Sequence, residues 1–110
     1  MTIRKTDIHK EKLEVIGRLV KQHRRIMGDL SCRTRWGFIR SSYDIGLPVG
    51  WISERSLANI ENGLNMPSII TLYNIARACQ IEPEQLFLEV ARILDEPIGY
   101  ETVSMDRDSE

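Results

Sequence analysis

The sequence of 110 residues predicts one all-α domain with five helices. In five segments the apolar residues recur three and four positions apart, the spacing that places side chains on one face of a helix. Several of these segments begin with a residue that caps helices, and one ends at a glycine that can stop a helix. A chain of this length can bury a small helical core without disulfide bonds or metal ions.

The first two predicted helices lie in the amino-terminal part of the chain. The first spans about residues 10–27 and ends at Gly28 and Asp29. Its apolar stripe consists of Leu13, Ile16, Val20 and Met27, and most of its basic residues lie off this stripe. The second helix is expected to start at Leu30, with Ser31 as its N-cap.

The third predicted helix runs from Ser53 to Asn62, which is about two turns plus its caps. Ser53 is a good N-cap, and Gly63 supplies the left-handed residue that ends helices. Leu57 and Ile60 share one face, whereas the polar side chains point elsewhere. Such a short helix suits the DNA major groove, where base edges present hydrogen-bond donors and acceptors. A plain surface helix is the alternative interpretation.

The fourth and fifth helices follow the same pattern. Ser68 caps the fourth, whose apolar stripe includes Leu72, Ile75, Ala76 and Cys79, so we expect Cys79 in the core. The fifth begins at Pro83, a residue suited to the first helical position, and extends to about Asp95. Its apolar stripe consists of Leu86, Val90, Ile93 and Leu94.

The net charge is −1, but the charges are unevenly distributed. Residues 1–40 contain 11 Lys and Arg against 4 Asp and Glu, whereas residues 41–110 contain 4 against 12. The basic part is where a surface facing a DNA backbone would lie, although ordinary solvated helix faces produce the same asymmetry. We divide the chain into a domain of residues 1–95 and an acidic tail of residues 96–110. The tail is too polar to fold alone and is expected to be flexible.

From the third predicted helix onward, a run of residues resembles the Cro/repressor-type helix-turn-helix domain of the XRE family of transcription regulators. These residues are Ile52, Ser53, Ser56, Leu57, Ile60, Glu61, Gly63, Pro67, Ser68, Leu72, Ile75 and Ala76. The likeness extends from about Ile16 to Phe87 and implies a lambda-repressor-like fold. One departure is clear: Ser31 and Ser53 are 22 positions apart, farther than in the family, so the segment between helices 2 and 3 is enlarged.

The enlarged segment has two interpretations. Trp36, Phe38, Ile39 and Ile45 are apolar enough to fold back on the core, and Gly46, Pro48 and Gly50 make the end of the segment a loop. The first interpretation is therefore a longer second helix followed by an ordered loop. The second is that Trp51, Tyr43 or residues 47–49 form an extra contact with a partner, a ligand or DNA.

The resemblance implies roles for several residues in DNA binding. Those expected to read bases are Glu54, Arg55 and Asn59, since Glu prefers cytosine, Arg guanine and Asn adenine. Glu54 also lies where an acid simply complements the helix dipole. Those expected to contact the DNA backbone are Ser31, Arg33, Ser53, Ser56 and Asn62. By the same resemblance, Arg24 and Glu61 should form a partly buried ion pair that positions the third helix.

The resemblance implies a sequence-specific regulator of double-stranded DNA, a repressor on a palindromic operator. One two-turn helix reads a single half-site, so we expect a homodimer. Its interface is expected on the fifth helix at Val90, Ile93 and Leu94. The alternative is an antitoxin-like interaction module, whose main partner is a toxin or effector protein and whose autoregulatory DNA binding is secondary.

The sequence offers no pattern typical of an enzyme, a metal site or a cofactor site. His9 and His23 have no cluster of Cys, Asp or Glu around them in the sequence, and Cys32 and Cys79 do not have the spacing of metal ligands. No apolar leader segment follows Met1, and no segment is long enough to cross a membrane. We therefore expect a cytoplasmic protein with reduced thiols, no catalytic residues and no cofactor.

Overall fold

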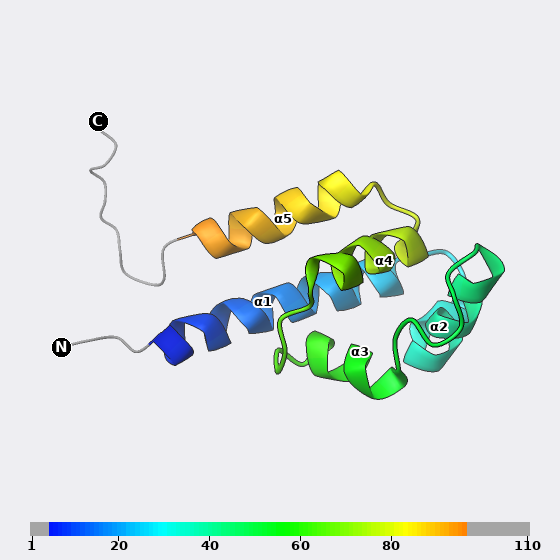
Figure 1. The fold of residues 1–110 in the computed structure, drawn as a ribbon, viewed down its shortest axis with the longest axis horizontal. Helices are drawn as coiled ribbons and strands as arrows, with labels where there is room; N and C mark the ends of the chain where they lie inside the picture. Colours follow the sequence, from blue (N-terminus) through cyan, green and yellow to red (C-terminus); the bar gives the residue numbers. More distant parts are fainter. Residues whose placement is uncertain (1–4, 97–110) are drawn as a thin grey trace.

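The computed structural model describes residues 5–96, and these residues contain five α-helices and no strand (Figure 1). The helices are α1 (Lys5–Arg25), α2 (Arg35–Asp44), α3 (Glu54–Glu61), α4 (Ile69–Cys79) and α5 (Pro83–Asp95), with a short 3-10 helix, η1 (Leu30–Arg33), between the first two. The all-α prediction is confirmed. The predicted acidic tail lies outside the described residues apart from its first residue, Glu96.

Helix α1 is the centre of the arrangement, because it packs against η1, α3, α4 and α5. In Figure 1, α5 runs beside α1 in the opposite direction, and α3 lies on the other side of α1. The most deeply buried large side chains come from all five helices and are Ile16, Val20, Phe38, Ile39, Leu57, Ile75 and Leu86. None of the described helices is long and apolar enough to span a membrane.

The starts of α3, α4 and α5 agree with the sequence predictions. The Ser53 hydroxyl accepts a hydrogen bond from the backbone N–H of Ser56 at 3.0 Å, and Ser68 caps α4 in the same way. Gly63 follows α3 with a φ of 76°, a left-handed conformation that glycine adopts without strain. Cys79 is buried, as predicted for a core residue.

The predicted start of the second helix is wrong. Ser31 lies inside η1, which is capped by Asp29, and α2 starts four residues later with Thr34 as its N-cap. The Thr34 hydroxyl accepts from the N–H of Gly37 at 3.0 Å. The first helix also differs from its predicted range of 10–27, since it begins at Lys5 and ends at Arg25.

The enlarged segment forms a helix followed by an ordered loop, residues 45–53, which matches the first of the two interpretations. Leu47 is buried and attaches the loop to the core. The indole Nε1 of Trp51 donates to the hydroxyl of Ser42 at 2.8 Å, so this side chain also holds the loop against α2. Phe38 and Ile39 are buried as expected, but the expectation is wrong for Trp36 and Ile45, which are 52% and 41% exposed.

Helices α1 and α3 approach each other closely at Gly17. A Cβ atom at this position would lie 2.5 Å from the carbonyl oxygens of Ile60 and Glu61. Real Cβ atoms do not come so near to backbone oxygens, so only glycine permits this packing. The contact places the last turn of α3 directly on α1.

Candidate nucleic-acid interface

One face of α3 is polar and open to solvent. Leu57 and Ile60 are buried, whereas Glu54 and Arg55 are exposed. Asn59 lies on the open side and is half-buried. The three side chains predicted to read bases are therefore not used by the core, and they remain close together on two turns of one helix.

The buried carboxylate of Glu61 joins two arginines from different elements. Arg24 of α1 donates through Nε and a terminal nitrogen to its two oxygens, at 2.7 and 2.9 Å. Arg35 of α2 donates through Nε to the same carboxylate at 2.9 Å. The structure thus brings Arg24 and Glu61 together, both almost completely buried, and adds Arg35, which the sequence analysis did not place in this cluster.

The remaining nitrogen of the Arg24 guanidinium binds the end of η1. It donates to the backbone carbonyls of Cys32 and Arg33, at 2.9 and 2.7 Å. One side chain of α1 consequently holds both the end of α3 and the residues that lead into α2. Since a guanidinium has a rigid planar fork of donors, these contacts fix orientation as well as distance.

A hollow of about 400 Å³ lies between α1, the start of α2 and the amino end of α3. We call it the basic hollow, and its lining residues are Lys21, Arg24, Arg25, Arg33, Thr34, Arg35 and Glu54. Five of these side chains are cationic, and Glu54 is the single acid among them. Such a concave, positively charged surface favours phosphate groups.

A second hollow, of about 480 Å³, lies on the α4 side of α3. We call it the hydroxyl hollow after its side chains Ser53, Ser56, Ser68 and Thr71. The Ser53 hydroxyl donates to that of Ser56 at 2.9 Å, and Ser68 donates to Thr71 at 3.0 Å. Ser53 and Ser68 use their hydroxyl protons in these two hydrogen bonds. Ser56 and Thr71 act as acceptors, so their own hydroxyl protons can be donated to a phosphate oxygen.

The residues predicted to contact the DNA backbone do not form one group. Arg33 lines the basic hollow, Ser53 and Ser56 line the hydroxyl hollow, and Asn62 is exposed at the end of α3. Ser31 lies apart from them. Its hydroxyl donates to Asp29 at 2.8 Å, and this hydrogen bond is the main cause that lowers the pKa of Asp29.

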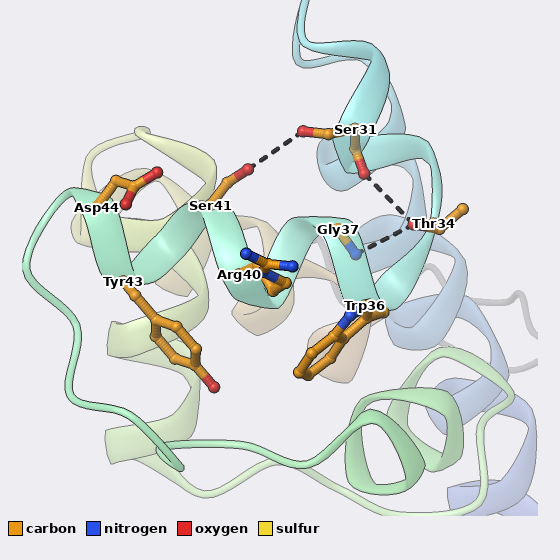
Figure 2. A pocket seen from close by; sticks show the side chains of 8 residues that line it. All are labelled: Ser31, Thr34, Trp36, Gly37, Arg40, Ser41, Tyr43 and Asp44. Carbon is orange, nitrogen blue, oxygen red and sulfur yellow. Dashed lines mark hydrogen bonds between the residues drawn. The ribbon is translucent and has the colours of Figure 1, made fainter.

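Ser31 belongs to a third hollow of about 470 Å³, shown in Figure 2. In this view Trp36 and Tyr43 extend below α2, and Arg40 lies across the front of the helix. Ser31 and Ser41 face each other above it, with their hydroxyl oxygens 3.2 Å apart. The hydroxyl proton of Ser31 is already donated to the carboxylate of Asp29. The hydroxyl that lines the basic hollow is instead that of Thr34, the cap of α2, which also donates a long hydrogen bond to the carbonyl of Ser31 at 3.4 Å.

Sequence reasoning did not assign Lys21, Arg25, Thr34 or Arg35 to the site. Lys21 and Arg25 are four residues apart on α1, so they lie on one face of that helix, which is a signal that periodicity could have found. The contact of Arg35 with Glu61 joins residues 26 positions apart, and no local pattern indicates it.

The expected dimer interface on α5 needs a correction. Val90 is only 4% exposed, because it packs in the core of its own chain, and Ile93 packs partly against that core. Leu94 is 44% exposed and is the one member of the three with a large open surface. The interface cannot depend on Val90.

Residues 49–86 match a family model described as Helix-turn-helix. The matched segment contains the end of the loop, α3, α4 and the first residues of α5, and it leaves out α1 and α2. A search of curated proteins and a search of solved structures each returned no match. The match and the all-α, lambda-repressor-like arrangement agree with the residues noted from Ile52 to Ala76. The chain therefore contains a Cro/repressor-type helix-turn-helix domain, the domain of the XRE family of DNA-binding transcription regulators.

Proposed function

We propose that this protein binds specific double-stranded DNA sites with α3 in the major groove. The observation that carries the proposal is the position of α3 between the basic hollow and the hydroxyl hollow. Successive residues of a helix are turned by 100°, so Glu54 and Ser56 lie on opposite flanks of Arg55. The major groove likewise has a phosphate backbone on each side, about 12 Å apart. Each hollow then receives one backbone while α3 reads the bases between them.

In this arrangement Arg55 and Asn59 are the base-reading residues, because they occupy the middle of the open face. Arg33 and Thr34 contact one backbone, and Ser56 contacts the other through its remaining hydroxyl proton. Asn62 is placed to contact a phosphate at the end of α3. Ser53 supports Ser56 rather than donating itself. Glu54 lies on the flank toward the basic hollow.

The proposal extends to a homodimeric repressor on a palindromic operator. Helix α3 has eight residues and reads one half-site, and two copies read two half-sites about 34–36 Å apart. A dimer blocks more DNA than a monomer does. We expect such a protein to work in the cytoplasm, where it can reach the DNA.

One observation favours a second function, that of an antitoxin-like module with a protein partner. Five apolar side chains are exposed along the α3–α4 connection and the start of α4: Leu64, Met66, Ile69, Ile70 and Tyr73. An apolar surface of this kind suits a protein contact. Purification of the protein with a tightly bound toxin or effector would favour this function, with DNA binding as a secondary, autoregulatory activity.

Selection of binding sites from random duplexes, followed by two variants, tests the primary proposal. Arg55→Ala should cost about 1–3 kcal/mol on the selected site and relax the preference at one base position. Arg33→Ala should weaken binding to every duplex and reduce the salt dependence by about one unit. Arg92→Ala, an exposed arginine of α5, is the control and should change neither property. An equal loss on selected and random duplexes in Arg55→Ala would show that Arg55 is a backbone contact.

A further inference from the structure

The position of Glu54 sets it apart from the other polar residues of α3. It is the only carboxylate that lines the basic hollow, together with the cations Lys21, Arg25 and Arg33 and the two arginines that bind Glu61. No ion pair within 4.0 Å joins Glu54 to another of the described residues. Glu54 therefore lines the hollow with a charge that has no fixed partner among the residues that the structure describes.

A DNA phosphate that enters the basic hollow meets attraction from these cations and repulsion from Glu54. Two like charges a few ångströms apart at a protein surface interact appreciably, because the effective dielectric there is well below that of water. The negative charge of Glu54 thus interacts with the same cations that a phosphate would contact. Its repulsion of the phosphate lowers the affinity for every duplex in which Glu54 has no other partner.

A suitable DNA site offers such a partner. Glu54 is the first residue of α3, and the amino end of a recognition helix lies nearest to the base edges. A carboxylate can accept a hydrogen bond from the exocyclic amino group of cytosine in the major groove. At a site with cytosine in this position, Glu54 binds the base and leaves the hollow to the phosphate.

From this arrangement we infer that Glu54 is a specificity-determining residue that competes with the DNA phosphate for the basic hollow. The inference rests on the proposed function and deepens it. Specificity here comes from a penalty on wrong sites as much as from a contact with the right one. Random duplexes keep the repulsion, whereas the preferred site removes it.

Glu54→Gln tests the inference, since it removes the charge and keeps the shape. Affinity for random duplexes should rise about tenfold, and their salt dependence should become steeper by about one unit. Affinity for the selected site should not rise, because the cytosine contact has already removed the repulsion there and the variant only weakens that contact. Glu84→Gln is the matched control: it removes an exposed acid from the first turn of α5, outside the hollow, and should leave DNA binding unchanged.

The outcomes separate the alternatives. A loss of affinity on the selected site with no gain on random duplexes would make Glu54 a base-reading residue only and would overturn the inference. Unchanged affinity on both would also overturn it. The double variant Glu54→Gln/Arg33→Ala adds a check, because the gain on random duplexes should shrink when the hollow loses a cation.

A titration with inorganic pyrophosphate, followed by NMR of the arginine side chains, tests the hollow without DNA. Glu54→Gln should bind pyrophosphate about tenfold more tightly than the unaltered protein. If the unaltered protein binds no duplex, the proposed function fails. The titration then still tests whether Glu54 competes with phosphate for the basic hollow. Equal pyrophosphate affinity of the two proteins would overturn the competition between Glu54 and phosphate.

Discussion

The guanidinium of Arg24 uses all three of its nitrogen atoms inside the fold. Arg24→Ala removes these contacts and leaves the carboxylate of Glu61 buried beside Arg35 alone. Breaking a buried ion pair costs about 3–5 kcal/mol, so we expect the free energy of unfolding to fall by this amount. Urea unfolding measures the change.

Two further variants make the Arg24 result specific. Arg18→Ala removes an exposed arginine from the same helix and should change stability by less than about 0.5 kcal/mol. Arg24→Lys should restore little, because an ammonium group cannot reproduce the fork that binds both carboxylate oxygens and the carbonyls of η1. An unfolding midpoint that Arg24→Ala leaves unchanged would contradict a structural role for the pair.

Cys79 gives a prediction about pH. Burial, with a smaller contribution from Cys32, raises the pKa of its thiol from the ordinary value of 9.0 to about 12. Above pH 9 the unfolded chain releases this proton and the folded chain keeps it, so stability should fall as pH rises from 9 toward 12. The fall should approach about 1.4 kcal/mol per pH unit. Urea unfolding at pH 8, 9 and 10 measures it.

The comparison for Cys79 is Cys79→Ser, whose hydroxyl does not titrate in this range. Other groups that ionise above pH 9 affect both proteins alike, so the difference between the two pH slopes belongs to the thiol. We expect the unaltered protein to lose stability more steeply than the serine variant. Equal slopes would mean that the folded protein does not hold this proton.

At the scale of helices, local signals predict α3, α4 and α5 well. Each begins at or directly after a residue suited to a helix start, Ser53, Ser68 or Pro83, and the apolar stripe follows it within the first turn. The start of α2 could not be chosen in this way. Asp29, Ser31 and Thr34 can all cap helices, and they lie within six residues. The choice among them depends on contacts with α1, which the local sequence does not contain.

The site shows the same division between local and distant information. The open face of α3 follows from the period of one helix, so Arg55 and Asn59 could be placed from the sequence. The basic hollow collects residues from α1, η1, α2 and α3, and Lys21 and Glu54 meet there only after folding. Charge counting showed that residues 1–40 are basic, but it could not show which of the cations converge.

The close packing of α1 and α3 predicts a large difference between two glycines. Gly17→Ala places a methyl group 2.5 Å from two carbonyl oxygens, so α3 must shift. We expect a loss of about 1–3 kcal/mol in the free energy of unfolding, and weaker DNA binding in the surviving folded protein. Thermal unfolding and binding to the selected duplex measure both effects.

Gly28→Ala is the control for Gly17→Ala. A Cβ at Gly28 would have no heavy atom within 4 Å, and the φ angle of Gly28 is not positive, so alanine can adopt the same backbone conformation. Stability should therefore be unchanged or slightly increased, since alanine reduces the freedom of the unfolded chain. A Gly17→Ala protein as stable as the Gly28→Ala protein would contradict the contact between the two helices.

At the scale of the whole molecule, the proposed dimer depends on the carboxyl-terminal part of α5. A truncation after Glu89 would remove Val90 from the core and unfold the domain, so a surface variant is the better test. Leu94→Asp should weaken dimerisation at least about tenfold, because it introduces a charge into an apolar contact. Sedimentation equilibrium over a range of protein concentrations measures the dissociation constant.

The control for the dimer is Leu88→Asp, which alters a leucine that is 51% exposed, against 44% for Leu94, and lies outside the predicted stripe of α5; it should leave the dimer intact. A dimer that survives Leu94→Asp but dissociates in Ile70→Asp would place the interface on the exposed apolar residues of α4. Either result also locates the surface that remains available to a protein partner.

The contact of Glu61 with Arg35 has a consequence for how this domain can change over evolution. In a motif with a short turn, the length of the turn fixes the distance between its two helices. Here the carboxylate of Glu61 in α3 binds the guanidinium groups of Arg24 and Arg35, and these contacts fix α3 relative to α1 and α2. None of the three residues belongs to the connecting residues 45–53. The tip of this connector is open to solvent, with Val49 81% exposed. Insertions and deletions at the tip can therefore accumulate while α2 and α3 keep their relative position.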